Sequence, residues 1–385
     1  MKFLKDFNFK DKRVLVRFGF DVPLKDGQVT NDFRIRTGVP TIEYLLNQGA
    51  KVILLTHLGR PNGQVVEELR VDPIGQKLAQ LIDKPVKKLD DCIGSAVVQA
   101  IEQMKSGQVI LLENVQFHPG EKTKDPSFIN LLASLADFFV FEAFGQAHRD
   151  YASISGLSKK MPSCAGLLLE KEIENLHQTM DKTEHPFVVI IGGVKISTKI
   201  KVIKNYLAKA DNLILGGALA NTVIRAKGFA IGKSIIEEEM VAQAEKLELT
   251  NNKLHIPVDV VASADPTGKS SSRIAPVGKT EPEEMILDIG PDTVHLFNQI
   301  IAQAKMIVWN GPMGLFEVGA FNSGSEQVAR AVAQSSAFSL VGGGDTICLL
   351  GELDLLDKID HVSTGGGAML KFLVNEKLPG IEALK

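Results

Sequence analysis

The chain has few cysteines, and nothing in their arrangement suggests that they pair. Cys92, Cys164 and Cys348 are the three cysteines among 385 residues; they form no CxxC motif, and an odd number cannot all pair within one chain. This usage is typical of reduced thiols in the cytosol. The N-terminal stretch also lacks the uninterrupted apolar segment of a signal peptide, because charged residues separate its apolar pairs. We therefore expect a cytoplasmic protein.

Long apolar runs, an excess of one charge and internal repeats are missing as well. No apolar run approaches the roughly 18 residues that a membrane-spanning helix needs. The net charge is −3, from 43 basic and 46 acidic residues, which argues against a general nucleic-acid binder. The absence of a repeat of about 20–50 residues argues against a solenoid. The expected partners are therefore small molecules, with no nucleic acid, no membrane and a monomeric state, and any anion site must be a local cluster.

What the sequence does contain is an alternation of short apolar strands and helical segments. The strands are rich in β-branched residues, and each is closed by Gly, Asn, His or Pro; they lie at 14–18, 52–56, 109–113, 138–142, 188–192, 213–217, 306–310, 338–342 and 361–365. Continuous apolar strands followed by helices are typical of parallel sheets covered on both faces. A chain of 41.8 kDa is also too long for one ordinary core. The prediction is an α/β fold of two doubly wound parallel-sheet domains joined by a hinge helix.

The connection between the two predicted sheets is a single amphipathic segment. After Pro162 the residues MPSCAGLLLEKEIENLHQTM have the pattern of one helix. We assign 1–162 to the N-terminal domain, 163–184 to the hinge helix and 185–367 to the C-terminal domain. A polar, turn-rich stretch at 263–284 is predicted to be a long surface loop.

In the first half, the segments that follow the strands are rich in Arg and His. Ligands of open parallel sheets bind beyond the carboxyl ends of the strands, so these side chains are expected to converge there: Arg17, Arg34, Arg36, His57, Arg60, His118, His148 and Arg149. Guanidinium groups bind carboxylate or phosphate in a planar fork. The pattern predicts a pocket for a small, multiply charged anion. The alternative is a set of surface arginines in ordinary salt bridges.

In the second half, the corresponding segments are glycine-rich. They lie at 191–199, 215–222, 309–314, 342–346 and 363–370. Glycine lets the backbone approach a phosphate closely, and a following helix offers free N–H groups and the positive end of its dipole. With Lys195 and Lys199 one turn apart, the pattern predicts a polyphosphate site. It matches neither GxxxxGK[ST] nor GxGxxG, so it is neither a P-loop nor a dinucleotide fingerprint.

Asp345, in GGGDT, offers a hard oxygen ligand for Mg²⁺ beside the expected phosphates. The alternative is that its side chain only caps the following helix. The residues alone thus predict a small anion on one domain and a Mg-nucleotide on the other. Bringing two such ligands together across a hinge, with water excluded, is what a phosphotransferase requires.

The motifs THLGRP, FGQAHR, GGVKISTK, WNGPMG, GGGDT and STGGGA resemble those of the phosphoglycerate kinase family along essentially the whole chain. The resemblance implies an N-terminal phosphoglycerate domain, a C-terminal nucleotide domain and a tail, 368–385, that returns to the first domain. It also implies transfer of a phosphoryl group between ATP and 3-phosphoglycerate, with Mg²⁺ accompanying ATP or ADP.

The resemblance further implies roles for individual residues. Phosphoglycerate would be bound by Arg34, His57, Leu58, Gly59, Arg60 and Arg149, and more weakly by Asp21 and Gln116. The nucleotide would be bound by Lys199, Asn310, Glu317, Gly343, Gly344, Asp345 and Thr346, with Glu317 on the ribose hydroxyls and Asp345 on Mg²⁺. The group in transfer would meet Arg34, Lys195, Lys199 and the amides of Gly365, Gly366 and Gly367.

The sequence departs from the family pattern only in the phosphoglycerate half. RFGFDVP has Gly19 where the family has Asp and Asp21 where it has Asn, and ENVQF has Gln116 where it has Arg. Lesser changes are Gln146 for Thr and Tyr151 for His. We expect weakened phosphoglycerate binding from these changes. Two alternatives stay open: a kinase for a related small acid, and a nucleotide-binding paralogue without turnover.

Overall fold

The structure is a computed structural model, and it describes residues 1–247 and 251–385. The chain divides into two compact units. The first comprises Met1–Glu174 with Asn375–Lys385, and the second comprises Asn175–Val374. Helix α7 (Leu167–Asp181) carries the chain from one unit to the other.

The first unit is built on a six-stranded sheet whose paired strands all run parallel. Its order is β5-β6-β4-β1-β7-β8. The strands are β1 (Arg13–Phe18), β4 (Lys51–Leu55), β5 (Val86–Lys88), β6 (Val109–Leu111), β7 (Phe138–Glu142) and β8 (Ser163–Ala165). A small hairpin, β2 (Leu24–Lys25) and β3 (Gln28–Val29), lies outside it. The predicted apolar runs of this half are therefore confirmed as neighbouring strands.

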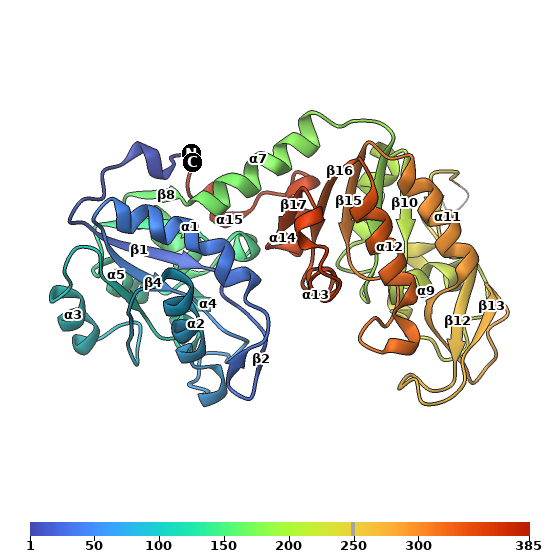
Figure 1. Ribbon diagram of the computed structural model, residues 1–385, viewed down its shortest axis with the longest axis horizontal. Helices are drawn as coiled ribbons and strands as arrows, with labels where there is room; N and C mark the ends of the chain where they lie inside the picture. Colours follow the sequence, from blue (N-terminus) through green and yellow to red (C-terminus); the bar gives the residue numbers. More distant parts are fainter. Residues whose placement is uncertain (248–250) are drawn as a thin grey trace. The chain divides into compact units, whose positions relative to one another are not determined.

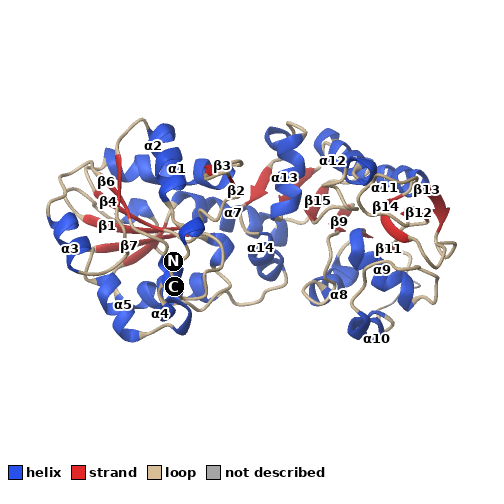
Figure 2. Cartoon of the chain, turned by 90° about the horizontal axis from the view of Figure 1, so that it is seen from below, coloured by secondary structure: helices blue, strands red, loops and turns tan. Residues whose placement is uncertain are grey.

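Helices cover both faces of this sheet, as the continuous apolar strands predict (Figure 2). Helices α1 (Phe33–Asn47) and α2 (Asp72–Ile82) bury Ile42 and Leu78 against alternate residues of β1, such as Val16. The opposite face carries the short helices α4 (Pro119–Thr123) and α5 (Pro126–Ala133). Helix α6 (Leu157–Lys160) packs against β7 and β8, and α15 (Pro379–Glu382) packs against residues 152–156. Helix α3 (Ser95–Glu102) lies between β5 and β6 in the chain.

Both ends of the chain lie in the first unit, close to each other (Figure 1). Near the N-terminus, Phe3 bridges to Ala165. Near the C-terminus, the Gly380 N–H donates to the Ala147 carbonyl at 2.9 Å, and Phe141 of β7 lies against Gly380. Residues 375–385 thus complete one face of the first sheet.

The second unit contains another six-stranded parallel sheet, in the order β11-β10-β9-β15-β16-β17. Its strands are β9 (Phe187–Ile191), β10 (Asn212–Leu215), β11 (Leu254–His255), β15 (Met306–Asn310), β16 (Phe338–Gly342) and β17 (His361–Ser363). The predicted apolar runs of this half are confirmed here too. Two doubly wound parallel sheets establish the α/β class.

Helices cover this sheet on both sides as well (Figure 2). One side carries α11 (Pro291–Ala302), α12 (Ser323–Gln334) and α13 (Gly344–Glu352), and the other carries α8 (Ile200–Lys209), α9 (Gly217–Ala226) and α14 (Gly366–Leu373). Trp309 of β15 is fully buried in the core with Phe297 and Val328. A one-turn helix, α10 (Val241–Ala244), packs beside α9.

The loop prediction for 263–284 is wrong in part. Strand β13 (Arg273–Pro276) lies within it and pairs antiparallel with β12 (Asp259–Ser263), which also pairs antiparallel with β14 (Met285–Ile289). Strand β13 is short, at the edge of the sheet, and exposed at all its residues except Ala275. Such a strand has no continuous apolar run, so its sequence pattern is that of a loop.

The predicted single helix after Pro162 also needs correction. Ser163–Ala165 form strand β8 beside β7, and helix α7 begins only at Leu167. The reason lies in the buried carboxylate of Glu142, which accepts the N–H groups of Leu168 at 3.0 Å and Leu169 at 2.9 Å. This side chain, supplied by β7, fixes the start of the helix.

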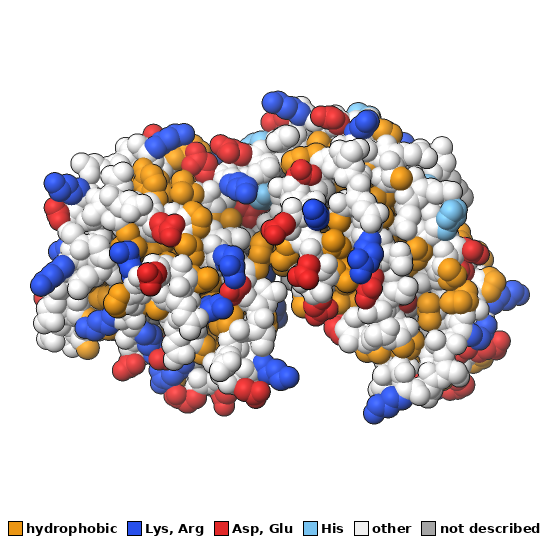
Figure 3. Space-filling view, in the orientation of Figure 1, with side chains coloured by type: hydrophobic (Ala, Val, Ile, Leu, Met, Phe, Trp, Pro, Cys, Tyr) orange, Lys and Arg blue, Asp and Glu red, His pale blue; other side chains and the backbone are white. Residues whose placement is uncertain are grey.

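The surface mixes charges of both signs. On the face drawn in Figure 3, Lys and Arg side chains alternate with Asp and Glu, as the small net charge leads one to expect. Among the described residues, no helix is long and apolar enough to cross a membrane. All three cysteines are free.

Candidate functional site

The strand order of the first sheet reverses at β1, which lies between β4 and β7. The chain passes from β1 to β4 on one side and later returns to β7 on the other. Ligands of doubly wound sheets bind at such a reversal. The segments that follow these strands are 19–23, 56–61 and 143–149, and they contain four of the eight predicted anion-binding residues: His57, Arg60, His148 and Arg149.

His57 is the centre of this cluster. Its side chain is buried, with Nδ1 3.3 Å from Nη2 of Arg17 and Nε2 3.9 Å from Oδ2 of Asp21. Burial, together with the positive charges of Arg17, Arg34 and Arg149, holds the pKa of His57 well below its usual value. The imidazole is therefore neutral amid cationic groups. The structure thus gathers arginines from three separate elements, which favours an anion pocket over unrelated surface salt bridges.

Arg17 supports His57 from beneath. It is fully buried, its Nε donates to Ser153 Oγ at 2.8 Å, and its burial lowers its pKa to about 10. Ser153 in turn donates from its N–H and its Oγ to the buried carboxylate of Glu121, at 2.9 and 2.6 Å. Arg17 was predicted among the ligand-facing arginines but lies buried beneath His57, and Glu121 and Ser153 were not predicted. A buried acid on a short helix gives no local signal of this network.

Asp21 is held by the THLGRP turn. Its Oδ1 accepts the Gly59 N–H at 2.9 Å, and Arg34 donates to its carbonyl. Gly59 has φ +63°, a left-handed conformation that favours glycine. Leu58 is buried, and its carbonyl accepts Nδ2 of Asn114 at 2.8 Å. These hydrogen bonds hold the backbone of the turn in place next to His57.

The remaining first-unit candidates differ in their surroundings. Arg60 and Arg149 have exposed side chains, so a ligand can reach them. Gln116 is buried, in the one-turn helix 115–117. Arg36 instead forms an exposed ion pair with Asp32 at 2.9 Å, and His118 bonds to Asp91 at 2.7 Å. These last two are engaged in pairs of their own rather than with His57.

In the second unit, glycine turns after β9, β10 and β15 pack directly on one another. A Cβ on Gly192 would lie 2.0 Å from the Pro312 carbonyl oxygen, and one on Gly217 would lie 2.6 Å from the Gly193 nitrogen. Gly217 and Gly311 also have φ of +65° and +98°. No larger residue fits these positions. The glycines therefore bring three backbone turns within contact at the carboxyl edge of the sheet.

Two further helix N-termini open onto the same edge. Gly366 lies against Gly343 and Asn310: a Cβ there would be 2.6 Å from the Gly343 nitrogen and 2.7 Å from Asn310 Nδ2. Asn310 is buried and donates to the Gly342 carbonyl at 2.7 Å. In α13 and α14, the first helical bonds come from Ile347 and Met369. The preceding amides, which include Gly344 and Gly367, thus have no acceptor within their own helices.

Lys199 lies against the first of these turns. Its Nζ donates to the Gly192 carbonyl at 2.6 Å. Burial lowers its pKa to about 8, an effect that the negative charge of Asp345 opposes. Lys195 is exposed on the same loop, and the loop is anchored where Ser197 donates from its N–H and Oγ to Glu237, at 2.8 and 2.6 Å. The turn thus presents one partly buried and one exposed ammonium group.

Asp345 is not the cap of its helix, so the alternative considered for it is wrong. Gly343, with φ +114°, occupies the N-cap position of α13, and no side chain caps the helix. The exposed carboxylate of Asp345 and that of Glu317 both line an otherwise largely apolar pocket that includes Ile235 and Leu315. An exposed hard oxygen beside free amides and Lys199 fits the chemistry of a Mg²⁺ ligand.

Three buried polar side chains support the glycine turns: Thr346, which the resemblance already implies as a nucleotide-binding residue, and Ser325 and Asp288, which the sequence did not predict. The Thr346 hydroxyl is buried and accepts the Gly311 N–H at 2.8 Å. Ser325 Oγ accepts the Met313 N–H at 2.9 Å. Asp288 is buried, accepts the Gly324 N–H at 2.7 Å, and has its pKa raised by burial to about 7. Asp288 is the single acidic residue within the apolar run MILDI, and this is the sequence feature that could have pointed to it.

Comparison with known proteins agrees with this arrangement. The model of the family described as phosphoglycerate kinase matches residues 4–376. A phosphoglycerate kinase of Moorella thermoacetica is 48% identical over 385 residues, covering 99% of this chain and 98% of the relative. That of Pelotomaculum thermopropionicum is 45% identical over 387 residues, covering 100% and 98%.

Solved structures give the same result. The phosphoglycerate kinase of Coxiella burnetii superimposes with a TM-score of 0.83 at 38% identity, covering 100% of this chain and 98% of that chain. The enzyme of Pyrococcus horikoshii OT3 gives a TM-score of 0.90 at 34% identity, with the same coverage. Sequence and fold agree over the whole chain, and this protein therefore belongs to the phosphoglycerate kinase family.

Proposed function

We propose that the chain transfers a phosphoryl group reversibly between ATP and 3-phosphoglycerate, giving ADP and 1,3-bisphosphoglycerate, as a step of glycolysis. The observation that carries this proposal is the pairing of two sites: glycine turns around Lys199 in one unit and arginines around a neutral His57 in the other. Phosphoryl transfer depends on positioning and charge neutralisation more than on covalent chemistry by the protein. Both sites offer these.

The nucleotide belongs on the second unit. The largely apolar pocket suits a purine ring, and Glu317 at its wall would accept the ribose hydroxyls. The amides of Gly343, Gly344, Asp345 and Thr346 and the side-chain amide of Asn310 would face the phosphates, since helix N-termini favour anions. Asp345 would hold the Mg²⁺ that accompanies the nucleotide. When bound, this ion supplies neutralisation of phosphate charge.

The acid belongs on the first unit. Arg34, Arg60 and Arg149 would pair with its carboxylate and phosphate, and the neutral imidazole of His57 would hydrogen-bond to it. The backbone at Leu58 and Gly59 would frame the site, with Asp21 and Gln116 as weaker contacts. Lys195, Lys199, Arg34 and the amides of Gly366 and Gly367 would neutralise the charge of the group in transfer.

The remaining assignments follow from this chemistry. Residues 1–162 would form the phosphoglycerate-binding domain, 163–184 the hinge helix, 185–367 the nucleotide-binding domain and 368–385 the returning tail. The free thiols suit a reducing compartment, and we propose a cytoplasmic monomer.

A coupled assay with 3-phosphoglycerate and Mg-ATP should show turnover above that with a panel of other small acids. Preference for another acid would favour a related kinase, and nucleotide binding without turnover with any acid would favour a paralogue.

Gln116→Arg should lower the KM for 3-phosphoglycerate about tenfold, because it adds a charged, forked donor worth about 1.5 kcal/mol to the anion pocket. The KM for ATP should stay unchanged, since position 116 lies in the first unit. The measurement is steady-state kinetics for both substrates. Gln76→Arg serves as the control. Gln76 is exposed on α2, so this variant adds the same charge outside the predicted anion pocket.

If the KM for 3-phosphoglycerate rises or stays unchanged in Gln116→Arg, position 116 does not face the phosphate of the acid. Gly19→Asp and Asp21→Asn extend the same series. Gly19 can accept a side chain, because its φ lies outside the left-handed range and a Cβ would meet Ala143 at an ordinary 3.8 Å.

A further inference from the structure

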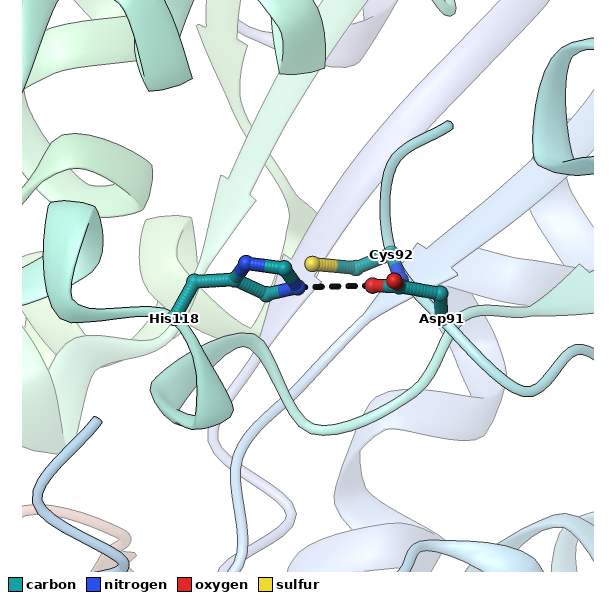
Figure 4. A group of neighbouring side chains, drawn as sticks. All are labelled: Asp91, Cys92 and His118. Atoms are coloured by element: carbon teal, nitrogen blue, oxygen red, sulfur yellow. Dashed lines mark hydrogen bonds and ion pairs between the residues drawn. The ribbon is translucent and has the colours of Figure 1, made fainter. Parts of the chain in front are cut away.

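A second cluster of ligand-bearing side chains lies in the first unit, apart from His57. Asp91, Cys92 and His118 come from two loops that follow the neighbouring parallel strands β5 and β6 (Figure 4). Each offers one potential ligand atom, and these three atoms lie within 4.8 Å of one another. A carboxylate oxygen, an imidazole nitrogen and a sulfur thus converge on one point from two segments far apart in sequence.

The three side chains are held in this arrangement before any ligand binds. The His118 ring stacks on Phe128, with ring centroids 5.2 Å apart and planes at 26°, and its Nε2 lies 2.7 Å from Oδ1 of Asp91. The same oxygen accepts the Cys92 N–H at 2.6 Å. Cys92 is fully buried, whereas the side chains of His118 and Asp91 are 28% and 51% exposed. The cluster is therefore rigid on one side and open to solvent on the other.

The local charge favours a cation. The carboxylates of Asp91 and Glu121 lie near the buried Cys92 thiol. The electrostatic environment of this thiol is therefore negative rather than positive. Such surroundings do not suit a nucleophilic cysteine, which needs neighbouring positive charge. A divalent cation, by contrast, would compensate the carboxylates and stabilise the thiolate.

We propose that Asp91, Cys92 and His118 bind one thiophilic divalent cation, with Zn²⁺ as the best match. Cys sulfur, His nitrogen and Asp oxygen are the ligand types of Zn²⁺, and three protein ligands leave a position for water. On binding, the Sγ–H proton leaves to solvent and a metal–sulfur bond forms. The Nε2–H···Oδ1 hydrogen bond gives way to one bond from each atom to the metal, and the neutral imidazole exchanges its single proton through solvent from Nε2 to Nδ1.

Cobalt provides a direct test, because Co²⁺ occupies zinc-type sites and gives a thiolate-to-metal charge-transfer absorption. The full chain, freed of metal by a chelator, should bind one equivalent of Co²⁺ with this band, and added Zn²⁺ should bleach it. Cys92→Ser should abolish the band. Cys348→Ser is the matched control. Cys348 lies on α13 in the second unit, whereas the cluster lies in the first, so its loss should leave the band intact.

His118→Asn keeps the cluster testable if Cys92→Ser fails to fold, because His118 lies partly at the surface. It should weaken Co²⁺ binding at least about tenfold, since a metal ligand is lost. Absence of the band in the wild type, or its persistence in Cys92→Ser, would overturn the proposal. These readouts are independent of phosphoryl transfer, so either proposal can fail without the other.

Discussion

Lys199→Met should lower kcat about 100- to 1,000-fold, the usual effect of removing one preorganised donor that stabilises charge in a transition state. In the structure Nζ is fixed to the Gly192 carbonyl beside the glycine turns, so no reorganisation is needed when a phosphoryl group arrives. Methionine roughly keeps the length of the side chain and suits its partly buried position. The loss should therefore appear in kcat, measured in the coupled assay, with little change in the melting temperature.

The control for this variant is Lys204→Met. Lys204 is exposed on α8, the helix that Lys199 begins, so the same charge is removed without touching the turn. Equal activity of the two variants would show that Lys199 has only a structural role at the Gly192 turn.

Titration of Lys199 should also shape the alkaline side of the pH profile of activity. Burial lowers the pKa of Lys199 from 10.5 to about 8, so the free enzyme loses this positive charge as the pH rises through about 8. The kcat/KM for nucleotide, which reports the free enzyme, should therefore fall above pH 8. Bound phosphate favours the charged amine, so kcat should fall only at higher pH. Lys199→Arg should remove the alkaline limb of both profiles.

Asp345→Ala should have the second large effect. We expect turnover to fall by about 100-fold or more while the fold stays intact. Helix α13 begins at Gly343 and Gly344 without a side-chain cap, so removing this carboxylate costs the helix no capping bond. The Mg²⁺ concentration needed for half-maximal activity should rise, because a hard oxygen ligand is lost. The measurement is kcat at a series of Mg²⁺ concentrations, together with the melting temperature.

Glu352→Ala is the matched control for Asp345, since it removes an exposed carboxylate from the far end of the same helix. Near-normal turnover and an unchanged Mg²⁺ requirement in Asp345→Ala would refute its assignment as the metal ligand. A drop in melting temperature without a change in Mg²⁺ requirement would assign it to stability instead.

The elements that could be predicted from sequence are those whose cause is local. Predicted strands such as 52–56, 188–192 and 306–310 carry a continuous apolar run, and burial between two helical layers requires such a run whatever lies beside it. The glycine turns at 192–193, 216–217 and 342–344 are local for the same reason, because a positive φ or a close backbone approach excludes a Cβ at that residue itself. Fold class and the candidate nucleotide edge therefore followed from the chain alone.

Tertiary structure decided everything that depends on a partner distant in sequence. Helix α7 starts at Leu167 because Glu142 reaches its first amides, and Arg17 supports His57 because Ser153 and Glu121 lie beneath it. Asp91 and Cys92 meet His118 only because β5 and β6 are neighbours. A buried polar group must find a hydrogen-bonding partner, but local sequence does not determine which residue supplies it. That choice is made by packing, and for this protein it determines which charged groups face a ligand and which lie beneath the site.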